Sequence, residues 1–162
     1  MSMGGSGEMT GDSTRCVHSA LDPEVTTGAV HTPIFQTSTY VQKDFADHLG
    51  YEYARGDNPT RNALQRALAE LESPHQAAYS FCFSSGMAAI TTVSQMLKQG
   101  DHVIACDDLY GGTVRLFDQI AARFGIETSY SALKKGELTP LIRENTKILW
   151  LESPTNPLLT VH

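Results

Sequence analysis

The sequence predicts an α/β fold in which an N-terminal arm leads into the first part of a mainly parallel sheet flanked by helices. After residue 80, short apolar runs alternate four times with segments of helical periodicity, and the connections between them are short. Such alternation favours parallel strands with helices on both faces. The predicted divisions are a tail over residues 1–13, an arm over 14–58 and a partial α/β domain over 59–162.

Composition and charge narrow the class of protein. The chain has 162 residues, enough for one domain with a sizeable core, and a formal net charge of -6. That charge argues against nucleic acid or an anionic membrane as the partner, because both need clustered Lys and Arg. No apolar run approaches membrane-spanning length, and the N-terminus lacks the basic segment followed by an apolar segment that is typical of a signal peptide. We therefore expect a cytoplasmic protein.

The cysteines and the N-terminal segments carry no catalytic motif. Cys16, Cys82 and Cys106 are widely spaced and predict reduced core thiols rather than a metal site. The Gly- and Ser-rich tail predicts disorder. The arm has apolar side chains but no local core, so we expect it to cover another surface, either of the same chain or of a partner subunit. His31 lacks a second ligand nearby, and no metal is predicted.

The first secure helix follows a turn at Gly56–Asn58. Asn58 is the predicted N-cap and Pro59 the first helical residue. Before the turn, Tyr53 and Arg55 alternate along a predicted extended segment, so both side chains should point the same way. A guanidinium beside a phenol suits a phosphate, which the planar fork can bind bidentately. The alternative is a solvated Arg beside a packed Tyr.

A strand, a turn and a helix come next. Residues 80–83 predict a short buried strand, and the period changes to helical at the turn Ser84-Ser85-Gly86. Unpaired backbone N–H groups and the helix dipole favour an anion in front of this turn, which Gly86 lets approach closely. The alternative is a well-capped strand–turn–helix without a ligand.

The remaining elements repeat the pattern. We expect strands over residues 102–106, 126–130 and 147–151, a helix from Thr113 to Phe124, and a short helix over 137–143. Ligands on parallel sheets collect at the carboxyl ends of the strands. Besides the Ser-Ser-Gly turn, this rule selects the loops 107–112 and 152–157.

These two loops suit a flat phosphorylated ligand. Tyr110 precedes Gly111-Gly112, which leave room above its ring for a stacked group. Glu152 and Asn156 place polar groups at the mouth of a buried strand. The alternatives are a packed loop aromatic for Tyr110 and turn capping for the other two.

Four segments resemble a known family: YEYARGDNPTRNALQRALAELE, FSSGMAAI, DDLYGGTVRLF and WLESPTNPLL. They are similar to the corresponding segments of the Cys/Met-metabolism pyridoxal-phosphate (PLP) enzymes, and the similarity runs from Thr14 to His162. The resemblance implies PLP as the cofactor and a truncated form of the type I fold of PLP-dependent transferases.

The resemblance also implies roles for residues that match the motifs. Tyr53 and Arg55 would reach the cofactor phosphate of a neighbouring subunit across a dimer interface. The backbone N–H groups of Gly86 and Met87 would bind the phosphate, and Tyr110 would stack on the pyridine ring.

Further matches concern the rest of the cofactor and the substrate. Glu152 and Asn156 would lie at the cofactor, with Asn156 near its phenolic oxygen, and Arg115 is a candidate for the distal carboxylate of a substrate. Tyr110 and Tyr53 are the predicted catalytic residues.

The implied activity is trans-sulfuration on a sulfur amino acid by a homo-oligomer, a dimer of dimers in the full-length form. We expect the cystathionine γ-lyase type, elimination at Cγ of cystathionine, with γ-synthase or β-lyase as alternatives. Methionine γ-lyases generally carry Cys where Gly112 stands. The family's Schiff-base Lys and its pyridine-pairing Asp lie beyond the ESPTNP segment and are absent here, so the chain alone is expected to be inactive.

Two other classes of function remain. A nucleotide-binding domain would need a G-x-G-x-x-G or Gly-Lys-Ser/Thr motif, which SSGMAA does not match. The other is a non-catalytic fragment that pairs with full-length subunits through its arm and the helix after Asn58.

Overall fold

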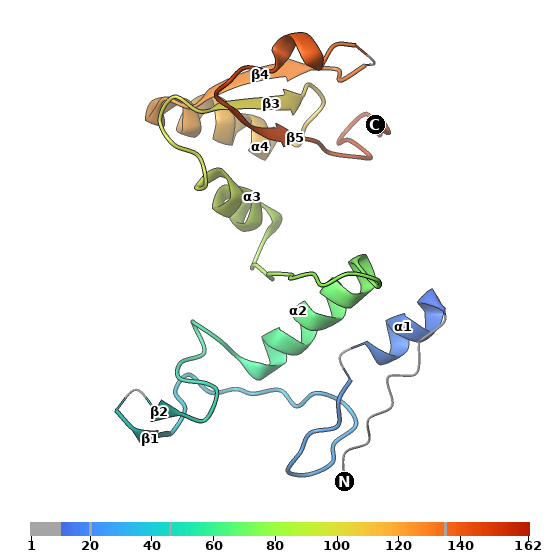
Figure 1. Ribbon diagram of the computed structural model, residues 1–162, viewed down its shortest axis with the longest axis vertical. Coiled ribbons are helices and arrows are strands. Elements are labelled where there is room, and N and C mark those ends of the chain that lie inside the picture. The colour runs from blue at the N-terminus through green and yellow to red at the C-terminus, as the bar shows by residue number, and fades with distance from the viewer. Residues whose placement is uncertain (1–10, 20, 46, 135) are drawn as a thin grey trace. The chain divides into compact units, whose positions relative to one another are not determined.

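The computed structural model describes residues 11–19, 21–45, 47–134 and 136–162. The tail predicted for residues 1–13 lies largely outside them. The chain divides into two compact units, Met1–Cys82 and Phe83–His162 (Figure 1). Each unit is described below by itself.

The first unit contains α1 (Asp12–His18), a short antiparallel pair β1 (Gln42–Asp44) and β2 (Asp47–His48), and α2 (Pro59–Glu72). Helix α1 corrects the prediction of an extended arm for residues 14–18. Its seven residues bury none of their side chains, so no apolar face marked it in the sequence. The Arg15 guanidinium pairs with the Asp12 carboxylate at 3.1 Å, one turn away.

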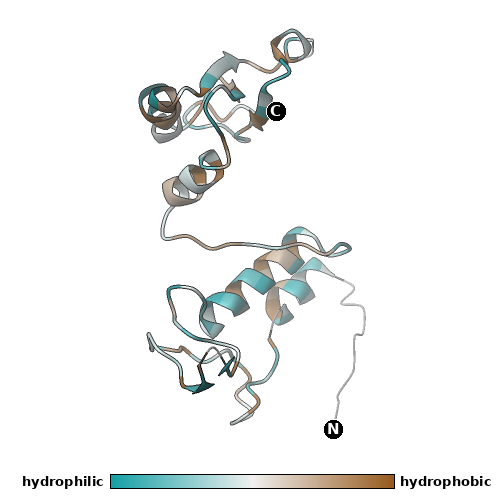
Figure 2. Cartoon of the chain, turned by 60° about the vertical axis from the view of Figure 1, so that its left-hand side comes forward, coloured by the Kyte–Doolittle hydropathy of each residue, from teal (hydrophilic) through white to brown (hydrophobic). Residues whose placement is uncertain are grey.

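Helix α2 begins as predicted. The Asn58 side chain accepts a hydrogen bond from the Thr60 N–H at 2.9 Å, and Pro59 is the first helical residue. Figure 2 shows hydrophilic and hydrophobic residues interspersed along this amphipathic helix. The arm is anchored to its first turn, because the Thr60 hydroxyl donates to the Pro33 carbonyl at 2.8 Å and accepts from the Phe35 N–H at 3.0 Å. Part of the arm therefore covers a surface of its own chain.

The second unit is a parallel sheet with the strand order β4-β3-β5. The strands are β3 (His102–Cys106), β4 (Glu127–Ser131) and β5 (Thr146–Trp150). They confirm the three predicted strands after residue 100 to within one residue at each end, and the predicted parallel arrangement. Strand β3 is central and buried at every position.

Helical segments precede and follow β3 along the chain. Helix α3 (Gly86–Ser94) precedes β3, and a continuous helical run follows it as α4 (Gly111–Arg115), a π-helical segment Leu116–Ile120 and a 3₁₀ segment Ala121–Phe124. Gly125 ends the run at φ 74°, which a residue with a side chain rarely adopts. The short helix predicted for 137–143 is only a 3₁₀ turn, Thr139–Leu141.

Residues 80–83 do not form the predicted buried strand. They are extended, but none is paired into a ladder with another described residue, and the Phe81 side chain is 75% exposed. The Cys82 N–H donates instead to the Gln65 side chain at 2.9 Å. A run with strand-like residues becomes a strand only beside a neighbouring backbone that completes the ladder.

The thiols also differ from the prediction. All three cysteines are free, as expected, but only Cys106 is buried; Cys82 is half-buried and Cys16 is exposed. Burial raises the pKa of the Cys106 thiol, which keeps it protonated and unreactive. Among the described helices, none combines the length and the apolar character that crossing a bilayer requires.

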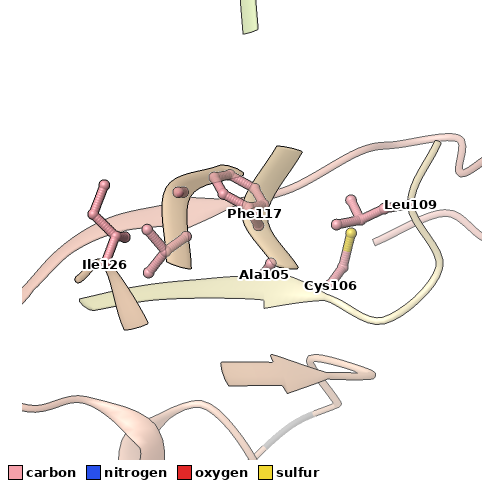
Figure 3. Close-up of a cluster of buried hydrophobic side chains, with 7 residues drawn as sticks. Ala105, Cys106, Leu109, Phe117 and Ile126 are labelled. Carbon is pink, nitrogen blue, oxygen red and sulfur yellow. The ribbon is translucent and has the colours of Figure 1, made fainter. Parts of the chain in front are cut away.

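The core lies between β3 and the helical run that follows it (Figure 3). Phe117 is 1% exposed and meets the Trp150 ring edge-on, with the ring centroids 5.6 Å apart. The cluster joins residues from β3, the loop after it, the helical run and the start of β4: Val103, Ala105, Cys106, Leu109, Phe117, Ala121 and Ile126.

His102 links all three strands from the start of β3. Its ring nitrogens lie 2.8 Å from the Thr146 hydroxyl and 2.9 Å from the Ser129 hydroxyl, and the residue is fully buried. Burial lowers its pKa from 6.5, the nearby Arg143 lowers it further, and Glu127 opposes the shift.

Acid should therefore destabilise the second unit through His102. The unfolded state takes up a proton as the pH falls through 6.5, whereas the folded state resists, so stability is lost from that pH downward to the lowered pKa of the folded state. We expect the melting temperature to fall between about pH 7 and about pH 5, and to fall less in His102→Gln, which cannot be protonated. The exposed His75→Gln is the control; equal pH slopes in all three proteins would contradict this role.

Candidate functional site

The loops after β3 and β5 are joined by Glu152. The two strands pair in parallel, so their carboxyl ends meet at one edge of the sheet, as predicted. The Tyr110 N–H donates to Oε2 of Glu152 at 2.9 Å, although 42 residues separate them, and the Thr113 hydroxyl donates to Oε1 at 3.1 Å. The structure thus brings together two of the predicted site residues.

The Tyr110 ring fits against Gly112. The side chain of Tyr110 is 46% exposed, so much of its ring is free to meet a ligand. A Cβ atom added at Gly112 would collide with that ring and would lie 2.7 Å from the Sδ atom of Met87. The absence of a side chain at Gly112 therefore makes room for Tyr110 and lets the first turn of α3 approach α4.

The first turn of α3 offers two free hydrogen-bond donors. The Ser85 hydroxyl accepts from the Ala88 N–H at 3.1 Å, and the Ser85 carbonyl accepts from the Ala89 N–H at 3.2 Å. Within the described part of the chain, no recorded hydrogen bond uses the N–H groups of Gly86 and Met87. A Cβ atom at Gly86 would meet nothing within 4 Å, so an anion has room there.

The loop after β5 is held by Thr155. This residue is 1% exposed; its N–H donates to the Thr160 carbonyl at 2.9 Å, and its hydroxyl accepts from the Thr160 N–H at 2.7 Å. Asn156 follows directly and is exposed, and no recorded bond to another described residue uses its amide. The loop therefore presents Asn156 from a fixed backbone.

Tyr53 and Arg55 belong to the first unit. Tyr53 is extended as predicted and forms an antiparallel bridge with Thr39. Arg55 lies on a turn instead, because the Tyr53 carbonyl accepts from the N–H groups of both Gly56 and Asp57 at 3.0 Å. The two side chains nevertheless lie together, with the Arg55 guanidinium carbon 4.9 Å from the centre of the Tyr53 ring, a cation–π geometry.

Arg61 braces this turn from α2. Its Nη1 donates to the Ala54 carbonyl at 3.1 Å and its Nη2 to the Gly56 carbonyl at 2.7 Å. The sequence analysis did not identify Arg61, Thr113 or Thr155. Each forms hydrogen bonds with residues that are not its neighbours along the chain, and no sequence motif marks such bonds. The exposed Arg115 folds back, with its Nη1 3.5 Å from where a Cβ atom at Gly111 would lie.

These groups suit an anionic, flat ligand. The two free N–H groups of α3 can donate hydrogen bonds to the oxygens of a phosphate, and the half-exposed ring of Tyr110 can cover an aromatic face. Within the described ranges, no group of three or more His, Cys, Asp or Glu side chains could hold a metal ion. The donors present therefore fit a phosphorylated aromatic cofactor such as PLP.

Comparisons with known proteins give one consistent family. A family model described as Cys/Met metabolism PLP-dependent enzyme matches residues 13–162. A probable cystathionine gamma-synthase of Herpetosiphon aurantiacus is 51% identical over 150 residues, 92% of this chain and 46% of that protein. The cystathionine gamma-lyase of Bacillus subtilis is 46% identical over 91% of this chain and 38% of its own length, and a Coxiella burnetii cystathionine beta-lyase is 44% identical over the same shares.

Solved structures agree in fold. The crystal structure of metB from Corynebacterium glutamicum matches with a TM-score of 0.88 at 36% identity, covering 94% of this chain and 40% of that one. A Lactobacillus plantarum cystathionine gamma-lyase complexed with L-serine matches with a TM-score of 0.86 at 38% identity, covering 93% and 39%. The chain thus spans less than half the length of each relative.

Proposed function

The chain belongs to the Cys/Met-metabolism family of PLP-dependent enzymes, and we propose that it is the N-terminal part of a trans-sulfuration enzyme of the cystathionine γ-lyase type. The reaction would be elimination at Cγ of cystathionine, and cystathionine γ-synthase or β-lyase activity is the alternative. The observation that carries the proposal is the junction of Tyr110, Glu152 and the first turn of α3 at one edge of the sheet.

In the proposed site, the residues of this chain bind and orient the cofactor. PLP, when bound, supplies an electron sink for carbanion chemistry at the amino acid. The N–H groups of Gly86 and Met87 would donate hydrogen bonds to its phosphate, and the Tyr110 ring would cover one face of its pyridine. Asn156 would donate its amide to the phenolic oxygen.

Other residues would act on the substrate or from a second subunit. Arg115 would pair with the distal carboxylate of the sulfur amino acid, which the guanidinium fork can bind bidentately. Tyr53 and Arg55 would reach the phosphate of a neighbouring subunit, and the phenols of Tyr110 and Tyr53 would touch the reacting atoms.

The wider organisation follows from the same proposal. Residues 14–58 would form an arm that meets a partner subunit, residues 59–162 would form part of the PLP-binding domain, and residues 1–13 would stay outside both. The complete enzyme would be a cytoplasmic dimer of dimers. Gly112 counts against a methionine γ-lyase type, because methionine γ-lyases generally carry Cys at this position.

A second candidate is a non-catalytic fragment that pairs with full-length subunits. It is favoured by apolar side chains that the first unit leaves exposed, among them Leu64 at 53%, Phe81 at 75% and Tyr79 at 90%. Mixing the chain with a full-length homologue and separating the mixture by size would test it. Co-elution supports pairing, whereas separate elution rules it out.

The proposed activity is tested in a chimera that joins this chain to the C-terminal remainder of the Herpetosiphon relative. The remainder would supply the Schiff-base Lys that the chain lacks, so the chimera should turn over and the chain alone should not. Cystathionine is offered for cleavage and, separately, a γ-activated homoserine with cysteine for synthesis. Release of cysteine supports the lyase type and formation of cystathionine the synthase type. A folded, PLP-bound chimera with neither activity would overturn the proposal.

A further inference from the structure

We infer that Glu152 is a positioning residue: its carboxylate sets the direction of the Tyr110 ring through the backbone of Tyr110 and does not itself contact the cofactor. The inference rests on the proposed function, since it concerns how Tyr110 covers PLP. It differs from the expectation, implied by the family resemblance, that Glu152 lies at the cofactor.

Both oxygens of Glu152 are already engaged. Oε2 accepts from the Tyr110 N–H at 2.9 Å, and Oε1 accepts from the Thr113 hydroxyl at 3.1 Å. Thr113 is fully buried, so the second bond is shielded from water. Hydrogen bonds to an ionised carboxylate are stronger than neutral ones, and this carboxylate also stands at the positive end of the helical run that begins at Gly111.

The Tyr110 backbone is consequently held from both sides. Its N–H is bound by Glu152, while its carbonyl accepts from the N–H groups of Thr113 at 2.8 Å and Val114 at 3.3 Å. The direction in which Cβ leaves this backbone is then fixed. The ring has little freedom beyond it, because it lies directly against the face of Gly112.

Two substitutions separate hydrogen bonding from charge. Glu152→Met keeps the length of the side chain but removes both acceptors, which releases the Tyr110 N–H. Glu152→Gln keeps one acceptor for that N–H, and its amide can donate to the Thr113 hydroxyl, which accepts equally well. A positioning role is therefore largely rescued by Gln, whereas a role that needs negative charge at the cofactor is not.

The experiment measures PLP binding by the chimera of this chain with the C-terminal remainder of the Herpetosiphon relative. Because stacking on the Tyr110 ring would contribute to PLP binding, we expect Glu152→Met to raise the Kd of PLP by about tenfold or more. Glu152→Gln should stay within about threefold of the wild type and keep the visible circular dichroism of the bound cofactor. Glu144→Met, at an exposed carboxylate just before β5, is the matched control and should change neither quantity.

A double-mutant cycle decides whether Glu152 acts through Tyr110. In a Tyr110→Ala background the ring is gone, so Glu152→Met should add no further loss of affinity. An additive loss there, or a Gln variant as weak as the Met variant, would overturn the inference. A wild-type chimera that binds no PLP would overturn the proposed function and the inference with it, whereas wild-type binding with an unaffected Glu152→Met variant would overturn the inference alone.

Discussion

The variant Phe117→Ala is expected to lose about 3–5 kcal/mol of its free energy of unfolding, a large part of the stability of an ordinary domain. Phe117 is 1% exposed and lies in the buried cluster on β3, against Trp150. Truncation removes the ring's burial and leaves a cavity that the rigid sheet cannot fill. Urea unfolding of the chain, followed by the fluorescence of Trp150, its single tryptophan, measures the loss.

The matched control is Phe124→Ala. Phe124 ends the same helical run but is 68% exposed, so its truncation should change the free energy of unfolding by about 0.5 kcal/mol or less. If Phe117→Ala fails to fold, Phe117→Leu should show a smaller loss in the same direction. Equal losses for Phe117→Ala and Phe124→Ala would contradict the placement of the core.

Arg55→Ala is expected to raise the Kd of PLP for the chimera by about a hundredfold or more. Two charge-assisted hydrogen bonds to a phosphate are worth about 1.5–3 kcal/mol each, and about 1.4 kcal/mol corresponds to a factor of ten. Pyridoxal, which lacks the phosphate, should bind the variant and the wild type equally. Equilibrium dialysis with both ligands gives the two ratios.

Two further variants sharpen this test. Arg55→Lys keeps the charge but loses the planar fork and the stacking on Tyr53, so its affinity should lie between those of the wild type and the Ala variant. Arg66→Ala removes a half-exposed Arg that faces Asp22 at 3.6 Å, and should leave the PLP affinity unchanged. An equal loss of affinity for PLP and for pyridoxal would show that Arg55 does not bind the phosphate.

The local elements of this chain could be predicted closely. Asn58 with Thr60, and Ser85 with Ala88, are helix caps whose partners lie two or three residues apart. The apolar run of β3 and the glycine that ends the helical run could likewise be recognised from the residues of those segments alone. The family motifs that pointed to PLP are of the same kind, since each is a short contiguous segment.

Other features were missed or wrongly predicted, because they depend on partners that are distant along the chain. Residues 80–83 have the composition of a strand, but a ladder needs a second backbone, and none of the described residues provides one. Helix α1 has no apolar face to mark it, and the turn that carries Arg55 is braced by Arg61 from the next helix.

The parallel α/β arrangement, the helix caps and the family follow from the amino-acid sequence, because hydrophobic period, capping chemistry and contiguous motifs are local properties. Three features appear only in the folded chain: Glu152 binds the Tyr110 N–H across 42 residues, Met87 packs beside Gly112, and the cysteines differ in burial. These contacts arise when parallel strands bring their carboxyl ends together, and a side chain's partners across that edge depend on register and packing rather than on its neighbours along the chain.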